Sequence, residues 1–216
     1  MFPDGSPVSH TEAAAVRNWT RGVNEFLAFD SFLPDTHIFN EDQYLCLKAG
    51  ERYTAQLKRG VDGSRVLVET TVWLSNSTGG GIVVRSDIAG AVGYFAGWRS
   101  SHPTLSIERW ESGGNITTVA SFDMSSLDCG LAADGWNMLR VVAEGSMISV
   151  YANPMFEDAV AAGGIRPRLV YIDQSGFAFT SGGVQLVSVP STSFQDSNDG
   201  DCTRFDYIGV LDPSVL

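Results

Sequence analysis

The feature that most constrains this sequence is a period-two alternation of side chains that begins near residue 43 and continues almost to the end. In the run 65–74 (RVLVETTVWL), the even-numbered positions hold Val, Val, Thr, Val and Leu, and the odd-numbered positions hold Arg, Leu, Glu, Thr and Trp. Successive side chains of a strand point to opposite faces. The run therefore predicts a β-strand with one buried face.

Eleven other runs share this β-rich pattern: 43–48, 52–58, 81–86, 92–98, 104–110, 115–121, 136–143, 146–152, 168–172, 183–189 and 203–211. Turn signals separate them, such as Asp62-Gly63, Asp134-Gly135 and Glu144-Gly145. Many short strands with glycine turns between them predict an antiparallel sandwich or jelly roll. A parallel α/β sheet is not expected, because no run is followed by a helical crossover.

Residues 9–27 carry the one good helical pattern. Ser9 and Glu12 have capping-box spacing. Apolar residues then recur at steps of three and four and form a single stripe: Val16, Trp19, Val23, Phe26 and Leu27. We expect an N-terminal helical segment over 1–27 and one β-domain over 28–216. Two interpretations of the stripe stay open: it packs on the domain's own core, or it docks on a partner protein or a second copy of the chain.

Charge and hydropathy exclude several classes of function. The chain has 216 residues and a formal net charge of −11, whereas a nucleic-acid surface needs clustered Lys and Arg. No stretch approaches the roughly 20 apolar residues of a membrane span. The N-terminus also lacks the basic and apolar regions of a secretory signal peptide. We expect no nucleic acid and no membrane span, and either a trimmed chain or synthesis in a cytoplasm.

Short motifs follow one another in a suggestive order: FDSF at 29–32, GIVVR at 81–85, GYFAGW at 93–98, LSIERW at 105–110, GWNMLRV at 135–141, SMISVYA at 146–152 and FDYIGV at 205–210. In this order they resemble the concanavalin A-like jelly rolls, and among them the laminin-G-like group. The resemblance covers residues 28–212 and implies an all-β, two-sheet antiparallel jelly-roll sandwich. Such folds host lectins, carbohydrate-binding modules, glycosidases, lyases and virion proteins, so function has to be argued from a site.

The residues that catalysis would need are not arranged for it in the sequence. Glycosidases that resemble this fold carry carboxylates at alternate positions of one strand, which places an acid and a nucleophile on the same face. No E-x-D or E-x-E falls in a predicted strand here, and Glu108 and Glu111 are three apart. No G-x-S-x-G is present either. A carboxylate pair assembled from distant strands stays open.

A binding patch is easier to propose. Sugars stack their C–H faces on aromatic rings and accept or donate hydrogen bonds through their hydroxyls. In the segment 94–99, strand alternation places Tyr94, Ala96 and Trp98 on one face; Arg99 follows, and a further Trp closes the next predicted strand. We predict that ligand is bound by Arg85, Tyr94, Trp98, Arg99 and Trp110. The alternative that Tyr94 and Trp98 lie in the core stays open. We expect Trp136, between an Asp-Gly turn and an apolar run, to lie in the core.

Calcium is the cofactor that the resemblance implies. Jelly rolls similar to this one bind a structural Ca²⁺ where the first and last strands meet, through an acidic residue and backbone carbonyls. Asp206 matches the late position and Asp30 the early one. Oxygen ligands of this kind suit Ca²⁺.

The expected function is therefore non-catalytic: a lectin-like recognition or assembly domain that binds glycan or polysaccharide. The layout of a short helix before one jelly roll also resembles minor tail and surface proteins of tailed phages, which implies an extracellular surface or a virion. The alternative is a carbohydrate-active enzyme of the same fold, either a glycoside hydrolase or a polysaccharide lyase.

Overall fold

The computed structural model describes residues 45–48, 53–56, 65–74, 78–87, 92–99, 104–125, 135–153, 166–176, 178–190 and 202–211. These residues form twelve strands: β1 (Leu45–Lys48), β2 (Tyr53–Gln56), β3 (Arg65–Leu74), β4 (Thr78–Ser86), β5 (Gly93–Trp98), β6 (Thr104–Trp110), β7 (Ile116–Asp123), β8 (Gly135–Glu144), β9 (Met147–Ala152), β10 (Leu169–Ile172), β11 (Gly183–Pro190) and β12 (Cys202–Leu211).

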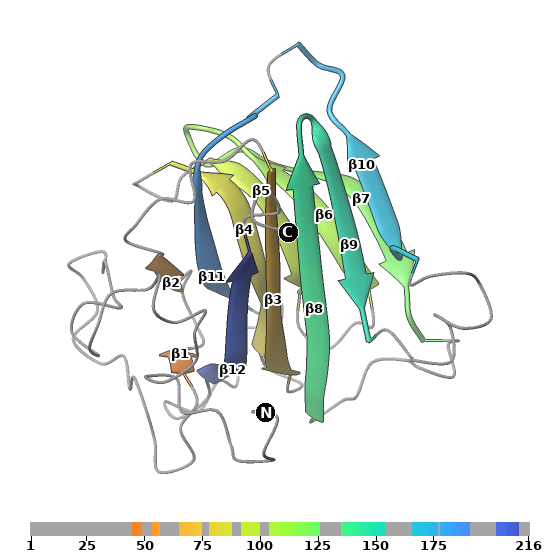
Figure 1. Ribbon diagram of the computed structural model, residues 1–216. Coiled ribbons are helices and arrows are strands. Elements are labelled where there is room, and N and C mark those ends of the chain that lie inside the picture. Colours follow the sequence, from red (N-terminus) through yellow and green to blue (C-terminus); the bar gives the residue numbers. More distant parts are fainter. Residues whose placement is uncertain are drawn as a thin grey trace.

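The strands make two six-stranded antiparallel sheets that pack face to face (Figure 1). Sheet A has the order β1-β12-β3-β8-β9-β10, and sheet B has the order β2-β11-β4-β5-β6-β7. In the view of Figure 1, sheet A is in front and sheet B is behind it. Every predicted strand run from residue 43 onward coincides with one of these strands, so the all-β, two-sheet prediction is confirmed.

The main core lies between the two sheets. On β3, the side chains of Val66, Val68 and Val72 are buried and alternate with partly exposed neighbours, as the sequence pattern predicts. Sheet B contributes residues such as Ile82 and Leu186 from the opposite side. Each of these side chains stabilises the fold by roughly 1.5–3 kcal/mol through removal of apolar surface from water.

The two sheets differ in their outer faces. On sheet A, the outward positions of β3 are partly exposed. On sheet B, all six residues of β5 are buried, on both faces of the strand. A second cluster of buried apolar residues therefore lies on the outer face of sheet B, separate from the main core: Val83, Phe95, Trp110, Val187 and Val189.

A buried polar contact joins the sheets. The Thr203 hydroxyl of β12 donates a hydrogen bond of 2.8 Å to the Gly79 carbonyl of β4, and it lies 2.9 Å from the Ser188 hydroxyl of β11. Both hydroxyl-bearing residues are fully buried. The contact satisfies these polar groups internally, which a buried hydroxyl requires.

The predicted N-terminal helix and the boundary between residues 27 and 28 lie outside the described residues. Within the part of the chain that the structure describes, no helix is long and apolar enough to cross a membrane.

Candidate functional site

An aromatic group lies at one end of the outer face of sheet A. Trp73 on β3 is directly opposite Trp136 on β8 and Arg204 on β12. The two indole rings meet edge to face, with centroids 5.4 Å apart and an angle of 82° between the ring planes. The Arg204 guanidinium lies 5.6 Å from the centroid of the Trp73 ring. This is a cation–π contact beside an aromatic pair, and 39% of the Trp136 surface is exposed.

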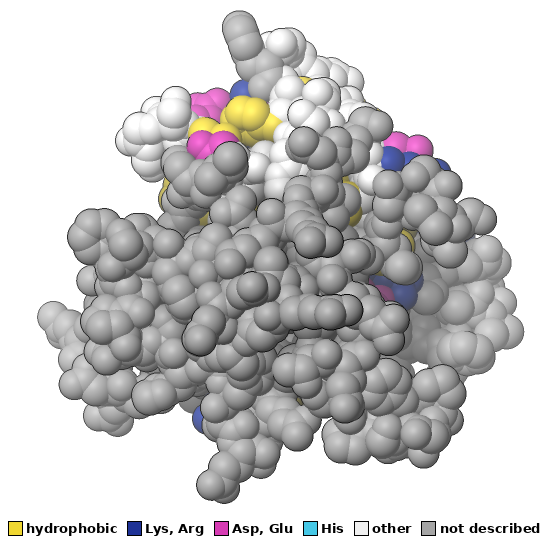
Figure 2. Space-filling view, turned by 60° about the vertical axis from the view of Figure 1, so that its left-hand side comes forward, with side chains coloured by type: hydrophobic (Ala, Val, Ile, Leu, Met, Phe, Trp, Pro, Cys, Tyr) yellow, Lys and Arg dark blue, Asp and Glu magenta, His cyan; other side chains and the backbone are white. Residues whose placement is uncertain are grey.

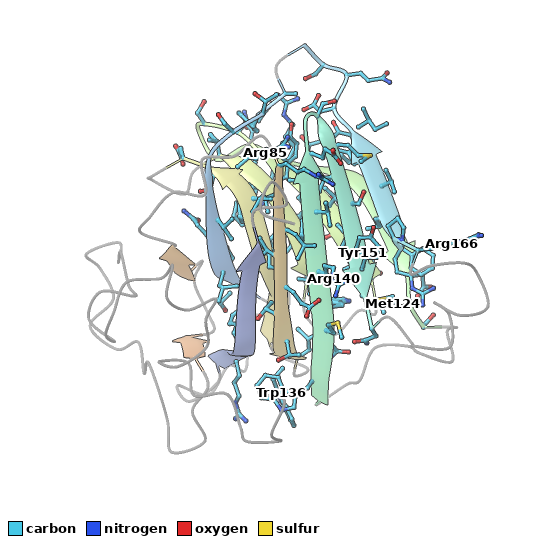
Figure 3. All side chains as sticks on the ribbon, in the orientation of Figure 1. Arg85, Met124, Trp136, Arg140, Tyr151 and Arg166 are labelled. Atoms are coloured by element: carbon cyan, nitrogen blue, oxygen red, sulfur yellow. The ribbon has the colours of Figure 1, made fainter. Side chains whose placement is uncertain are left out.

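A charged group occupies the middle of the same face. Glu69 and Arg140 pair across β3 and β8, and Arg140 Nε donates a hydrogen bond of 2.6 Å to Glu69 Oε2. A second guanidinium nitrogen contacts the same carboxylate. Tyr151 on β9 lies opposite Arg140 in the ladder, and Figure 3 shows both on the near side of the sheet, above Trp136. Both paired side chains are partly exposed.

Together these residues form what we call the sheet A platform: Glu69, Trp73, Trp136, Arg140, Tyr151 and Arg204. The aromatic and charged rows are four residues apart along β3, which is about 13 Å at the rise of a strand. Such a surface offers aromatic rings for stacking and a guanidinium–carboxylate pair for hydrogen bonds. The polar groups lie on the outer face of sheet A.

Two of the predicted ligand-binding residues lie elsewhere, in the main core. Tyr94 and Trp98 point inward from β5, and neither has exposed surface. Trp136, in contrast, is exposed, so the expectation that it lies in the core is wrong. Alternation along a strand defines two faces but does not say which of them is covered.

The predicted neighbours Trp98 and Trp110 are separated within the β5–β6 hairpin. Trp98 lies opposite Leu105, whereas Trp110 lies opposite Gly93 at the other end of the hairpin. They also point to opposite faces, because Trp98 belongs to the main core and Trp110 to the outer-face cluster of sheet B.

Arg99 and Trp110 share one hydrogen-bond acceptor, Glu108, which was not among the predicted binding residues. Glu108 accepts a hydrogen bond of 2.7 Å from Arg99 Nη2 and one of 3.0 Å from Trp110 Nε1. The Glu108 side chain is buried, and 34% of the Arg99 side chain is exposed. The hydrogen bond to Glu108 raises the pKa of Arg99 above its ordinary value, against the effect of burial. The spacing of Glu108 and Trp110, two apart on one strand, was the available signal.

Phe95 completes this cluster on the outer face of sheet B. Its ring stacks on Trp110 with centroids 5.2 Å apart and planes 4° apart. It also lies over the cross-strand pair Gly81 and Gly97, where an added Cβ would come within 3 Å of the ring. Glycine is required at both positions because any side chain would displace the ring or the neighbouring strand.

A third group closes one end of the sandwich around Tyr94. Its hydroxyl donates a hydrogen bond of 2.5 Å to Asp173 and accepts one of 3.2 Å from the Phe179 amide. Arg109 Nη1 lies 3.4 Å from the same Asp173 carboxylate and donates to Ser175 Oγ at 2.9 Å. These contacts join β5 and β6 of sheet B to the connection between β10 and β11.

Arg85, the remaining predicted binding residue, reaches the same end from a bulge. It is the extra residue of β4 opposite β11 and has a left-handed backbone, with φ of 58°. The side chain is buried and donates to the carbonyls of Gly145 and, at 2.8 Å, Phe179. Burial lowers the pKa of Arg85 from its ordinary value, while the nearby Tyr94 opposes that shift. Bulges that re-aim a side chain in this way have no simple sequence signal.

Within this group, the Tyr94 hydroxyl keeps its proton and donates it in a hydrogen bond to Asp173. Burial and the hydrogen bond to Asp173 raise the pKa of the Tyr94 hydroxyl well above its usual value of 10. A general base must instead be deprotonated near the working pH, because only then can it accept a proton. Tyr94 therefore acts here as a hydrogen-bond donor that fixes Asp173.

The structure gives little information about the two predicted calcium ligands, Asp30 and Asp206. Asp30 lies outside the described residues. Asp206 lies opposite Thr71, next to an irregularity at which the ladder between β12 and β3 skips one residue. A bulge of this kind frees a carbonyl from the ladder, which would suit a cation. The residues that the structure describes contain no group of three or more His, Cys, Asp or Glu side chains able to hold a metal.

Comparison with solved structures identifies the architecture. The carbohydrate-binding module CBM66 from Bacillus subtilis superposes with a TM-score of 0.55 at 17% identity, over 76% of this chain and 83% of that chain. A protein of unknown function with a galectin-like fold, also from Bacillus subtilis, gives 0.54 at 9% identity, over 81% and 85%. The exoplasmic/lumenal domain of VIP36, in a Ca²⁺- and mannose-bound form, gives 0.51 at 9% identity, over 80% and 79%.

At these identities the likeness shows the fold alone. The chain thus has a two-sheet jelly-roll sandwich fold like that of these structures, as the motif order implied. No protein-family model matches the chain, and no curated protein matches it in sequence.

Proposed function

We propose that this chain is a non-catalytic, lectin-like recognition domain that binds an extended polysaccharide on the sheet A platform. The observation that carries the proposal is the exposed Trp136 ring, which meets Trp73 edge to face, with Arg204 over the Trp73 ring. An exposed aromatic side chain in a fixed orientation is a surface on which the C–H face of a sugar ring can stack.

The shape of the platform favours a chain of sugars over a single sugar. The aromatic row and the Glu69–Arg140 row are about 13 Å apart, so one ligand that reaches both must be extended. In the face shown in Figure 2, most of the coloured Lys and Arg side chains lie next to Asp or Glu side chains. Arg140 is paired in the same manner, which leaves it able to share hydrogen bonds with hydroxyls without favouring a strongly anionic ligand.

Two further points support recognition on an outer surface. Two of the structures with this fold are described with a carbohydrate: CBM66 is a carbohydrate-binding module, and the VIP36 domain is in a Ca²⁺- and mannose-bound form. Polysaccharides of cell walls and capsules lie outside the cell, so a domain that binds them would act on the surface of a cell or a particle. A phage virion, suggested by the layout of the sequence, is one such particle.

Affinity electrophoresis against a polysaccharide panel tests the proposal, followed by titration calorimetry with the ligand found. Replacement of Trp136 by Ala should weaken binding about tenfold or more, which is about 1.4 kcal/mol. Ile116→Ala is the matched control, because Ile116 is also exposed but lies on β7 of sheet B. Equal affinity of the two variants would contradict the platform, and release of reducing ends from any polysaccharide would contradict the non-catalytic function.

A further inference from the structure

A second group of side chains on the outer face of sheet A is largely apolar and adjoins the sheet A platform. The register places Ser149 of β9 between Val142 of β8 and Val170 of β10. One row further, Met147 of β9 lies opposite Ile172 of β10. These side chains point outward, because residues that alternate with them along the strands belong to the main core. We call the group the Ser149 patch: Val142, Met147, Ser149, Val170 and Ile172.

The exposure of this patch sets it apart from the rest of the described surface. Four large apolar side chains are exposed within the described part of the chain, and three of them, Trp136, Val170 and Ile172, lie on the outer face of sheet A. Val170 is 49% and Ile172 is 50% exposed. Exposed apolar side chains that gather on one face mark a site of interaction.

Ser149 forms the lowest point of the patch. It is only 6% exposed although it faces outward, because its side chain is shorter than those of Val142 and Val170 on either side. Its hydroxyl is the one polar side-chain group among the five residues of the patch. The patch thus combines apolar walls with a hydroxyl at its floor.

The patch continues the platform along β8, which limits what it can bind. Val142 is two residues beyond Arg140, about 7 Å at the rise of a strand. Two residues beyond Val142, Glu144 pairs with Arg65 at 3.4 Å. On β8 the apolar surface is therefore one residue wide between two ion pairs. A membrane, or a protein helix about 10 Å wide, would have to bury these charges, whereas a small apolar group would not.

We propose that the Ser149 patch binds an acetyl group of the polysaccharide, carried as an O-acetyl ester or an N-acetyl amide. The inference rests on the proposed function, because a polysaccharide on the platform brings its substituents to the adjoining patch. An acetyl group joins one methyl to one carbonyl oxygen. The methyl packs against Val142 and Val170, and the Ser149 hydroxyl donates a hydrogen bond to the carbonyl oxygen.

Chemical deacetylation of the ligand tests the proposal. The polysaccharide that binds most tightly in affinity electrophoresis is titrated in its native form, after mild alkali, which removes O-acetyl esters, and after hydrazinolysis, which also removes N-acetyl groups. We expect the affinity to fall about tenfold at the step that removes the acetyl group, and that step identifies the ester or the amide. Equal affinity of all three forms, or a tightest ligand that carries no acetyl group, would overturn the proposal.

The same titrations with variants place the acetyl group on the protein. Ser149→Leu fills the floor of the patch and should bind the native and the deacetylated forms equally. Ser121→Leu is the matched control, because Ser121 is exposed on β7 of sheet B, and it should keep the tenfold preference. Ser149→Ala, which keeps the small side chain, should lower the preference about threefold, through loss of one hydrogen bond. An unchanged preference in both Ser149 variants would overturn the proposal.

Two further outcomes separate this inference from the proposed function. If Trp136→Ala weakens binding but deacetylation does not, the acetyl site is wrong and the platform stands. If no polysaccharide of the panel binds, both are wrong. Binding of the wild type to phosphatidylcholine vesicles that Ser149→Leu abolishes would also overturn the acetyl site, because a lipid would then occupy the patch.

Discussion

Asp173 is a buried carboxylate that makes the stability of this fold depend on pH. Burial alone would raise its pKa, but hydrogen bonds from Ser175 and Tyr94, together with the Arg109 charge, outweigh burial and leave the pKa below its usual value of 3.8. The charged form is thus favoured in the folded state. Such a group stabilises the fold above its unfolded pKa, and this stability is lost as the pH falls through its folded pKa.

Asp173→Asn should therefore change stability in a pH-dependent manner. At pH 7 the variant should be less stable than the wild type by about 1–3 kcal/mol, because a charged acceptor of buried hydrogen bonds is lost. The difference should narrow as the pH falls below 3.8, where the wild-type carboxylate takes up a proton. Urea unfolding between pH 7 and pH 3 measures both curves, and a constant difference over that range would count against this explanation.

At the scale of the element, the β5–β6 hairpin is held on its outer face by an ion pair in which Glu108 is buried and the Arg99 side chain is 34% exposed. Arg99 follows β5, Glu108 lies on β6, and Trp110 binds the same carboxylate. Removal of one partner from a buried pair leaves the other charge without compensation, which is more costly than loss of an exposed pair.

Glu108→Ala should destabilise the protein by about 3 kcal/mol, since it leaves the Arg99 guanidinium and the Trp110 indole N–H without their acceptor. Glu111→Ala is the control. Glu111 pairs with Arg109 at 3.3 Å, but its side chain is 42% exposed, so its loss should cost less than about 1 kcal/mol. Chemical denaturation of both variants measures the two values, and similar losses would show that burial of Glu108 does not matter.

The β5–β6 hairpin also shows what could be predicted from the sequence alone and what could not. Alternation located all twelve strands, because strand periodicity is a local property of the chain. It did not determine which face of a strand is covered when both faces carry apolar residues, as Tyr94, Phe95 and Trp98 do on β5. Trp98 was predicted to bind ligand but lies in the core, whereas Trp136 was expected in the core but is exposed.

A second limit on prediction from the sequence was that residues far apart in the chain are neighbours in the structure. The meeting of Trp73 with Arg204 depends on the pairing of β3 with β12, which are about 130 residues apart in sequence, and no local pattern encodes that pairing. The bulge that turns Arg85 toward Gly145 is similarly invisible in the sequence. The candidate site could therefore be identified only from the register of the sheets, whereas the fold class could be predicted from the sequence.

At the scale of the whole molecule, the proposed calcium site at Asp30 and Asp206 would link the two ends of the β-domain. We predict that Ca²⁺ raises the melting temperature of the wild type. At a free concentration 100 times Kd the gain is about 2.7 kcal/mol, or about 5–10 °C for a chain of this size. Ca²⁺ should not raise the melting temperature of the Asp206→Ala variant. It should still raise that of Asp123→Ala, whose substitution is at an exposed position of β7. Identical melting curves with Ca²⁺ and with EDTA would refute the site.

The central claim is that polysaccharide binds on the sheet A platform. Its five tryptophans give this chain five indole N–H signals, which nuclear magnetic resonance resolves and single Trp→Phe variants assign. On titration with the polysaccharide found by affinity electrophoresis, we expect the Trp136 and Trp73 signals to shift and those of Trp98 and Trp110 to stay in place. Shifts of Trp98 or Trp110 with Trp136 unmoved would contradict the platform.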